Sequence, residues 1–231
     1  MTLYQPESGY CYNSDSLFLY DFITKFKPKG TMLDVGAGCG IVGLLCVRDY
    51  DKIKLDAIEK QALFLPYARK NAVVNSLEYT LYHGDFLSFD FDKKYDFIIS
   101  NPPFYHSEST KSEDEMLKIA RYNTHLPLNT FFKKVSQTLK PKSHFVFCYD
   151  AKHFGEICAE LSRVKMNIVD VQFVHPKIDR VASLVLVHAR NGSKSLMKVM
   201  EPFISFDSEE QSDDAKKIYA KAKTKSIKCQ L

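Results

Sequence analysis

The sequence predicts an α/β fold: a Rossmann-like, seven-stranded, mostly parallel sheet with an antiparallel last strand and helices on both faces. From Thr31 onward, short apolar runs alternate with longer amphipathic segments, which is the rhythm of a doubly wound sheet. A glycine-rich turn follows the first apolar run. The last two runs are joined by the loop 176–182, which is too short for a crossover helix, so these two strands must be antiparallel.

Each expected element follows from a local pattern. The run 95–100 (YDFIIS) is almost continuously apolar, as expected for a strand buried on both faces. Residues 14–26 predict a helix before the sheet, with Ser14 as its N-cap. Further helices are expected from the glycines to about residue 50 and at 61–75, 128–139 and 153–164. Strands are expected at 31–35, 54–58, 79–82, 95–100, 144–149, 167–175 and 183–190.

The chain divides by composition at about residue 192. We expect residues 1–192 to form one domain and residues 193–231 to form a C-terminal extension that ends in a basic helix, beginning near Ser212. Six scattered cysteines without a C-x-x-C pair indicate reduced thiols. With no signal-like N-terminus and no stretch that could span a membrane, we expect a cytoplasmic protein. The net charge of +4 permits an anionic partner without requiring one.

A glycine motif, Asp34-Val-Gly36-Ala-Gly38-Cys-Gly40, follows the first predicted strand. Glycine lets the chain turn sharply and brings bare backbone against a ligand at the carboxyl end of the sheet. A dinucleotide fingerprint, G-x-G-x-x-G, would require glycine at position 41, where this chain has Ile41. The spacing therefore favours a ligand without a pyrophosphate.

Two further acids follow at the ends of the next strands. Glu59 ends the second strand, where a carboxylate can accept hydrogen bonds from both hydroxyls of a ribose. Asp85 follows the third strand and can accept from an adenine amino group while Phe86 packs on the ring. Either acid alone would be typical of a solvated helix cap. The order of Asp34, Glu59 and Asp85 at successive strand ends favours a nucleoside site.

The motif Asn101-Pro102-Pro103-Phe104 follows the buried fourth strand. Proline fixes φ and removes a donor, which leaves the carbonyls here as outward acceptors. The amide oxygen of Asn101 and the carbonyl of Pro102 can accept from one –NH2 group. These bonds favour a pyramidal nitrogen whose lone pair can attack a methyl group in line. Phe104 offers a stacking face for a flipped-out base. A strand terminator followed by a buried phenylalanine is the simpler alternative for this motif.

Together these motifs resemble the class I methyltransferases that act on amino nitrogens and use S-adenosylmethionine. The segments 13–17 (NSDSL), 120–122 (ARY) and 174–190 are similar to the bacterial tRNA adenine-N6-methyltransferase family, which methylates the adenine 3′ of the anticodon in a valine tRNA. The similarity covers roughly residues 5–192. It implies a cofactor site without metal and catalysis by the N-P-P-F motif, with Ser14 and Asp15 near the cofactor mouth. The residues implied to hold the cofactor are Asp34, Gly36, Gly38, Gly40, Glu59, Asp85 and Phe86.

The implied partner is a folded tRNA, with no membrane partner and a monomer as the default state. Arg121 is a candidate for RNA phosphate, as are Lys217, Lys221 and Lys225 in the basic tail. A solvated terminal helix is the alternative for the tail, because exposed basic residues are usually just solvated surface. If the tail binds RNA, truncation after about residue 207 should weaken RNA binding and leave cofactor affinity unchanged.

Other functions share parts of this pattern. N-P-P-[FY] motifs also occur in enzymes that methylate guanine N2 in ribosomal RNA or the glutamine amide of release factors. A non-catalytic RNA-binding protein on a methyltransferase scaffold is a third alternative, which the intact Asp34, Glu59 and N-P-P-F set disfavours. The histidines show no metal-ligand spacing.

Overall fold

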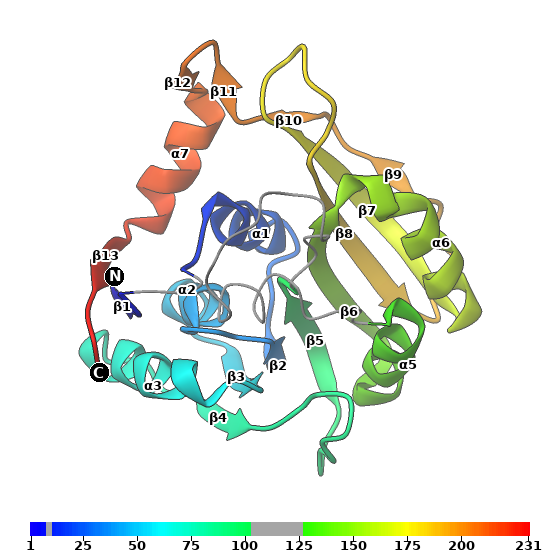
Figure 1. Cartoon of the computed structure of the whole chain (residues 1–231). Coiled ribbons are helices and arrows are strands. Elements are labelled where there is room, and N and C mark those ends of the chain that lie inside the picture. Colours follow the sequence, from blue (N-terminus) through cyan, green and yellow to red (C-terminus); the bar gives the residue numbers. More distant parts are fainter. Residues whose placement is uncertain (8–10, 103–126) are drawn as a thin grey trace.

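The structure is a computed structural model that describes residues 1–7, 11–102 and 127–231. Its centre is a twisted nine-stranded sheet with helices on both faces (Figure 1). The strands of this sheet are β2 (Gly30–Val35), β3 (Ile53–Glu59), β4 (Thr80–His83), β5 (Tyr95–Ser100), β6 (Leu139–Asp150), β7 (Met166–His175), β8 (Leu184–Asn191), β9 (Lys198–Val199) and β10 (Phe203–Ile204).

The strand order confirms the predicted topology. Seven strands run in the order β4-β3-β2-β5-β6-β8-β7, and β8 is antiparallel to both of its neighbours while the other pairs among the seven are parallel. The two strands that the sequence did not predict, β9 and β10, are two residues long and pair with β7 at the edge of the sheet. The fold is that of the class I methyltransferases.

Helices α1 and α5 lie on opposite faces of β6. Phe131 and Phe132 of α5 pack on Phe145 of β6, whereas α1 lies over the face that carries Cys148. Successive side chains of a strand point to opposite faces, so the two helices lie on opposite sides of the sheet. The helices are α1 (Ser14–Thr24), α2 (Ile41–Asp49), α3 (Leu65–Val74), α5 (Leu128–Thr138), α6 (Phe154–Arg163) and α7 (Asp213–Ala222), with short 3-10 turns η1 (Ala62–Phe64) and η2 (Ala151–His153).

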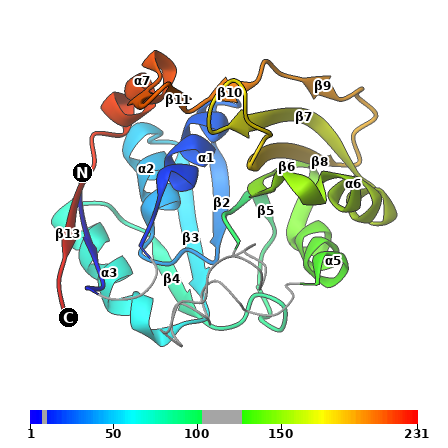
Figure 2. The ribbon, with the colours of Figure 1, turned by 45° about the horizontal axis from the view of Figure 1, so that its top comes forward.

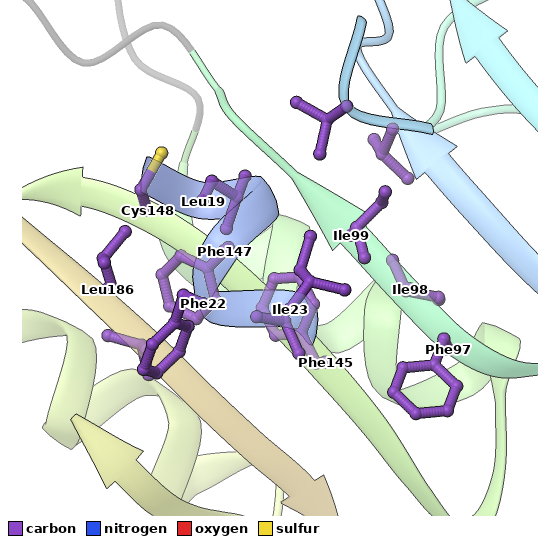
Figure 3. Packing of buried hydrophobic residues seen from close by; sticks show 14 of the residues in the cluster. Leu19, Phe22, Ile23, Phe97, Ile98, Ile99, Phe145, Phe147, Cys148 and Leu186 are labelled. Carbon is purple, nitrogen blue, oxygen red and sulfur yellow. The ribbon is translucent and has the colours of Figure 1, made fainter. Parts of the chain in front are cut away.

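The hydrophobic core is continuous across the sheet. Figure 3 shows Leu19, Phe22 and Ile23 of α1 lying over β5 and β6, and all three side chains are fully buried. Helix α1 is buried on most of its surface because it contacts α2 and α7 as well as the sheet. This packing fixes the start of α1 at the carboxyl edge of the sheet, beside the end of β5.

Several boundaries differ from those predicted. Helix α1 begins at Ser14, but its N-cap is Asn13, whose extended backbone lets its side-chain oxygen accept from the N–H of Asp15 at 3.2 Å. Strand β6 begins at Leu139 rather than at His144, because Leu139 pairs with Tyr95 before a register shift. Among the described residues, no helix is both long and apolar enough to cross a membrane.

The chain ends in elements that the sequence did not predict. After a small hairpin of β11 (Phe206–Asp207) and β12 (Glu210–Gln211), α7 begins after its N-cap Ser212, as expected. The basic helix was also expected to end the chain, and this is wrong: α7 ends at Ala222, and β13 (Lys225–Lys228) pairs in parallel with β1 (Thr2–Gln5). Local periodicity could not reveal this pair, because each strand has four residues and its partner lies at the other end of the chain.

Candidate functional site

The glycine loop joins β2 to α2 at the carboxyl edge of the sheet. Gly36, Gly38 and Gly40 have φ values of 70°, 54° and 86°, in the left-handed region that favours glycine. A Cβ atom built at Gly36 or Gly38 would meet no heavy atom within 4 Å, so the space beside these two residues is open. The loop therefore presents bare backbone to an open space, as its sequence predicts.

Asp34 is the last residue but one of β2, directly before this loop, and is almost fully buried. Its Oδ2 atom accepts a 3.0 Å hydrogen bond from the backbone N–H of Gly43 in α2. A Cβ at Gly43 would lie 2.8 Å from that oxygen and 2.9 Å from Leu55, so only glycine lets α2 approach so closely. Burial raises the pKa of Asp34 to about 7, partly offset by the Gly43 bond, and the nearby Glu59 raises it further. The carboxyl group can therefore change its charge near neutral pH.

Glu59 ends β3 and fixes the same loop from the other side. Its Oε2 accepts from the N–H of Gly38 at 2.8 Å, and its Oε1 accepts from the N–H of Gln61 at 2.7 Å. Burial raises the pKa of Glu59, although these backbone hydrogen bonds act in the opposite direction. The N–H of Lys60 also bonds to this carboxylate, which leaves about one of its four lone-pair sites for a hydroxyl group of a ligand.

A pocket opens between the glycine loop and the end of β5. It brings together Asp34, Gly36 and Gly38 with Asn101, which are four of the residues that the sequence predicted for the site. The rest of its lining is mainly apolar or aromatic, which suits the flat and aliphatic parts of a nucleoside ligand. The other lining residues are Tyr12, Ser16, Ala37, Cys39, Ile41, Val42 and Phe64.

Asn101 is held in place by two buried neighbours that sequence reasoning missed. Its amide nitrogen donates to the Ser16 hydroxyl at 3.1 Å, and its amide oxygen accepts from the Cys148 thiol at 3.0 Å. Ser16 comes from α1 and Cys148 from β6, the strand that pairs with β5. Burial raises the pKa of the Cys148 thiol well above its ordinary value, which keeps the proton on sulfur. The amide plane of Asn101 is therefore fixed while its oxygen keeps a free lone pair.

Asp85 and Phe86 do not occur among the described residues that line this pocket. Asp85 forms an ion pair with Lys60 at 2.9 Å; burial would raise its pKa, but the bonds from Lys60 and from the N–H of Leu87 lower it. The ring of Phe86 packs in the core, 5.7 Å from that of Phe131. The roles expected for these two residues at an adenine ring stay predictions.

The aromatic side chains that do line the pocket are Tyr12 and Phe64. Phe64 lies in the 3-10 turn η1, which follows Glu59 by only a few residues, so the end of β3 was a signal for it. Tyr12 comes just before the segment Asn13-Ser14-Asp15 that the sequence placed near the cofactor mouth. The resemblance thus pointed to the neighbouring residues Ser14 and Asp15 and did not identify Tyr12.

The remaining predicted residues are those outside the described ranges and three lysines of the C-terminal segment. Pro103, Phe104 and Arg121 lie outside the described residues, as does the loop 106–118. In the C-terminal segment, Lys217 forms an exposed ion pair with Asp214, whereas the Lys221 ammonium donates to Asp21 and Thr24 of α1. Lys225 lies exposed on β13, the strand that replaces the expected end of the helix. Their proposed contacts with RNA stay predictions.

Comparison with known proteins assigns the family. The profile of the methyltransferase small domain family matches residues 13–144, which is more than half of the chain. The chain belongs to this family. The matched region contains the glycine loop, both loop-binding carboxylates and the whole N-P-P-F motif.

Curated relatives of this family member act on RNA. It is 33% identical over 94 residues to the ribosomal RNA small subunit methyltransferase C of Actinobacillus pleuropneumoniae serotype 7 (strain AP76), over 41% of this chain and 28% of that protein. It is 30% identical over 118 residues to the tRNA1(Val) (adenine(37)-N6)-methyltransferase of Aliivibrio fischeri, over 50% of each. The chain thus spans half or less of the length of these two relatives.

Solved structures show the same fold. A predicted O-methyltransferase from Agrobacterium tumefaciens superposes with a TM-score of 0.70 at 15% identity, covering 93% of this chain and all of that one. The T. thermophilus 16S rRNA guanine-N2 methyltransferase, solved with AdoMet and guanosine, superposes with a TM-score of 0.57 at 17% identity, covering 80% of this chain and 44% of that one. These likenesses confirm the class I methyltransferase fold.

The cofactor is S-adenosylmethionine, and the pocket fits it. Asp34 lines the pocket, and within the described residues no cationic side chain pairs with it or with Glu59. A buried carboxylate in the pocket wall, with a second one fixing the adjoining loop, favours a ligand that carries positive charge. The open space beside Gly36 and Gly38 lets the ligand touch the backbone directly. The residues present therefore fit a cationic, nucleoside-like ligand.

Proposed function

We propose that this methyltransferase transfers a methyl group to the exocyclic N6 amine of adenine in a tRNA, at the position next to the anticodon. The observation that carries the proposal is the fixed side chain of Asn101 at the mouth of the cofactor pocket. A fixed amide acceptor beside the methyl donor suits an amino nitrogen better than a hydroxyl or a carbon nucleophile, because the amine keeps an N–H for the acceptor.

Asn101 would act on the transition state. The lone pair of an exocyclic amine is delocalised into the base, so the nitrogen is a poor nucleophile. The Asn101 oxygen and the Pro102 carbonyl would each accept one N–H of the amine, which favours the pyramidal nitrogen needed for attack. S-adenosylmethionine supplies the electrophilic methyl group when bound. Because Ser16 and Cys148 already fix the Asn101 amide, its reorganisation during the reaction would be small.

The choice of adenine in tRNA rests on two kinds of support. Residues 13–17 and 120–122 match the tRNA adenine-N6 family, and a tRNA1(Val) adenine-N6 methyltransferase is among the relatives. The rival is guanine N2 of ribosomal RNA, which relatives and a structural neighbour also support. Both amines can meet the same Asn101 acceptor, so the docking surface for the RNA must decide between them.

Nucleoside analysis after reaction with purified RNAs tests the proposal. The protein would be incubated with labelled S-adenosylmethionine and valine tRNA, with the same tRNA carrying guanine in place of the target adenine, and with ribosomal RNA of the small subunit. We expect N6-methyladenosine in the first tRNA and none in the second. N2-methylguanosine in ribosomal RNA with unmodified tRNA would assign the protein to the rival activity. Label in a release factor incubated in a parallel reaction would assign it to the glutamine activity. An absence of label in every acceptor, with cofactor bound, would point to a non-catalytic RNA-binding protein.

A further inference from the structure

Tyr12 is a pocket residue whose position depends on the opposite end of the chain. It lines the cofactor pocket together with Asp34, Gly38 and Asn101. Its hydroxyl donates to the Thr224 hydroxyl at 3.2 Å, across more than 200 residues of sequence. The pocket wall formed by Tyr12 is thus bonded to the C-terminal segment, defined here as residues 212–228.

A second bond fixes the backbone of Tyr12. Its N–H donates to Oε1 of Gln5 at 2.8 Å, and Gln5 is 2% exposed. The other end of the Gln5 amide donates to the Ser226 hydroxyl at 2.6 Å, and the Gln5 carbonyl accepts from the N–H of Cys229 at 3.0 Å. Both the main chain and the side chain of Tyr12 therefore depend on contacts of β13 and of the turn before it.

The N-terminal strand is bound from both sides. On one side β1 pairs with β13 in parallel, with Thr2 opposite Lys225. On the other side two asparagines of α3 bind its backbone: Asn71 accepts from the N–H of Tyr4 at 2.7 Å and donates to its carbonyl at 3.0 Å, and Asn75 makes the same pair of bonds with Thr2 at 2.9 and 2.7 Å. Figure 2 shows β1 lying between β13 and α3.

Asn71 connects β1 to the glycine loop through its side-chain amide. Its amide nitrogen also donates to the carbonyl of Cys39 at 2.9 Å, and Asn71 is fully buried. Cys39 lies between Gly38 and Gly40, at the backbone that faces the open pocket. A continuous set of hydrogen bonds therefore runs from β13 through β1 and Asn71 to the cofactor loop.

The C-terminal segment also contacts the helix that supports Asn101. The Tyr219 hydroxyl of α7 is hydrogen-bonded to the Ser14 side chain at the start of α1, and Lys221 donates to Asp21 one turn before its end. Ala222 at the end of α7 is fully buried. The segment thus contacts the pocket wall at Tyr12 and the first turn of α1.

We propose that Tyr12 contacts S-adenosylmethionine and that the C-terminal segment is its positioning element, acting through Thr224 and Gln5. The affinity for the cofactor then depends on the C-terminal end of the chain, contrary to the expectation that truncation affects RNA binding alone. This inference concerns the cofactor site and does not need the RNA substrate, so its test stands apart from the test of the proposed function.

The test is calorimetric titration of the full-length protein with S-adenosylmethionine and, separately, with S-adenosylhomocysteine. Tyr12→Ala removes the ring from the pocket wall, and we expect affinity for both ligands to fall about tenfold or more. Tyr12→Phe and Thr224→Val each remove one partner of a neutral hydrogen bond, and we expect each to lower the affinity by about twofold to tenfold.

A double-mutant cycle separates positioning from general stability. If the two hydroxyls act through each other, the double variant Tyr12→Phe/Thr224→Val should bind no more weakly than the weaker single variant. Thr224→Ser keeps the hydroxyl and should restore wild-type affinity. The matched control is Tyr82→Phe in β4, whose ring packs on Phe89 away from the pocket lining. Melting temperatures without cofactor verify that each variant folds.

The outcomes are distinct. Wild-type affinity in folded Tyr12→Ala would remove Tyr12 from the cofactor contacts. If Tyr12→Ala binds weakly but Thr224→Val and Tyr12→Phe bind like wild type, the positioning role of the C-terminal segment is wrong. Equal losses in Tyr12→Phe and Tyr82→Phe would also overturn the proposal, because the effect would then be general.

Discussion

Two buried titratable groups, Asp34 in the parallel half of the sheet and His144 next to the antiparallel half, are affected by burial in opposite directions because one is an acid and the other a base. Burial raises the pKa of Asp34 to about 7 and lowers that of His144 to about 4, in each case by penalising the charged form. Asp34 lies next to the last residue of its strand and lines the pocket. His144 lies within β6, and its ring stacks on that of Phe97 with centroids 4.4 Å apart.

Asp34 and His144 also differ in their hydrogen-bond partners. His144 Nδ1 lies 2.9 Å from Nε2 of His188, whose Nδ1 lies 2.8 Å from Oδ2 of Asp170, so a chain of three side chains crosses β6, β8 and β7. Phe26 of the segment after α1 covers His188 with ring centroids 4.0 Å apart. The ring nitrogens and the carboxylate in this series are hydrogen-bonded to one another, whereas one carboxylate oxygen of Asp34 faces the open pocket. The comparison indicates that side chains near the strand ends of the parallel half are available to a ligand. The side-chain series His144–His188–Asp170 in the antiparallel half contributes to stability instead.

The largest expected effect tests where catalysis resides. Asn101→Ala removes the acceptor for the reacting amine, and we expect single-turnover rates to fall about 100-fold or more while S-adenosylmethionine affinity stays unchanged. His144→Gln is the control from the other region and should react at the wild-type rate at pH 7.5. A wild-type rate in Asn101→Ala would reject the proposed mechanism. A large loss in folded His144→Gln would break the division between the two regions.

Asp34 should make cofactor binding depend on pH. Its pKa is about 7 in the free protein, and a bound cation must lower it, so binding releases a proton. Affinity should therefore rise with pH through about 7 and level off above it. Asp34→Asn removes this dependence and should weaken binding at pH 8 by about 1.5 to 3 kcal/mol.

Calorimetry at pH 6, 7 and 8, in buffers of different ionisation enthalpy, measures both quantities. The ligand has an ionisable amino group of its own, so the informative quantity is the difference between Asp34→Asn and the wild type. Parallel pH profiles for the two proteins would show that Asp34 does not exchange a proton with the cofactor.

The parts of the molecule that the sequence predicted are those with local signals. β5 was predicted to the residue because YDFIIS is almost wholly apolar, and the glycine loop because its spacing is diagnostic. Asn101 was placed correctly at the pocket, since a strand end in a parallel sheet has a defined location. These features depend on residues close together in the chain.

What the sequence did not reveal depends on distant partners. Nothing near Asn71 indicates that its amide binds the backbone of β1 and the glycine loop together. The pairing of β1 with β13 joins the two ends of the chain, and Tyr12, which lines the pocket, is hydrogen-bonded to Thr224 in the turn before β13. The strand-end rule also placed Phe86 at the cofactor. Its ring packs against Phe91 and Phe131 in the core, and its contact with the cofactor stays a prediction.

The histidine chain should make stability depend on pH. Burial lowers the pKa of His144 and of His188, so between about pH 6.5 and pH 4 the unfolded chain binds more protons than the folded protein. Stability contributed by these groups is therefore present above about pH 6.5 and lost as the pH falls. His144→Gln should reduce the difference in unfolding free energy between pH 7.5 and pH 5 by about 1 kcal/mol, allowing for solvent screening.

Urea unfolding at the two pH values checks this, with His83→Gln as the control because His83 is exposed at the end of β4. Only the difference between wild type and variant is informative, since Asp34, with its raised pKa, acts in the opposite direction. An identical loss on acidification in His144→Gln and wild type would show that the chain does not set the acid stability.

The smallest expected effect concerns RNA binding by the C-terminal segment. Lys217 is 75% exposed at its side chain and pairs only with Asp214, a surface pair that costs little to break. Lys225 is exposed on β13, but Lys221 is held by Asp21 and Thr24. If Lys217 and Lys225 contact phosphate, the double variant Lys217→Ala/Lys225→Ala should bind tRNA more weakly. The negative slope of log affinity against log salt should become less steep by roughly two units.

Lys221→Ala is the matched control for this measurement. It removes one lysine charge from α7, the helix that also carries Lys217, but we expect the salt slope to stay near that of wild type because the Lys221 ammonium already has partners on α1. Fluorescence titration of labelled tRNA between 50 and 300 mM salt, on the order of the range over which phosphate contacts are lost, gives the slopes. If Lys217→Ala/Lys225→Ala keeps the wild-type slope, the segment does not bind RNA, and its contribution to the site is the position of Tyr12. If Lys221→Ala changes the slope as much as the double variant does, its ion pair with Asp21 opens on RNA binding, and the segment then links RNA contact to the first helix and the cofactor pocket.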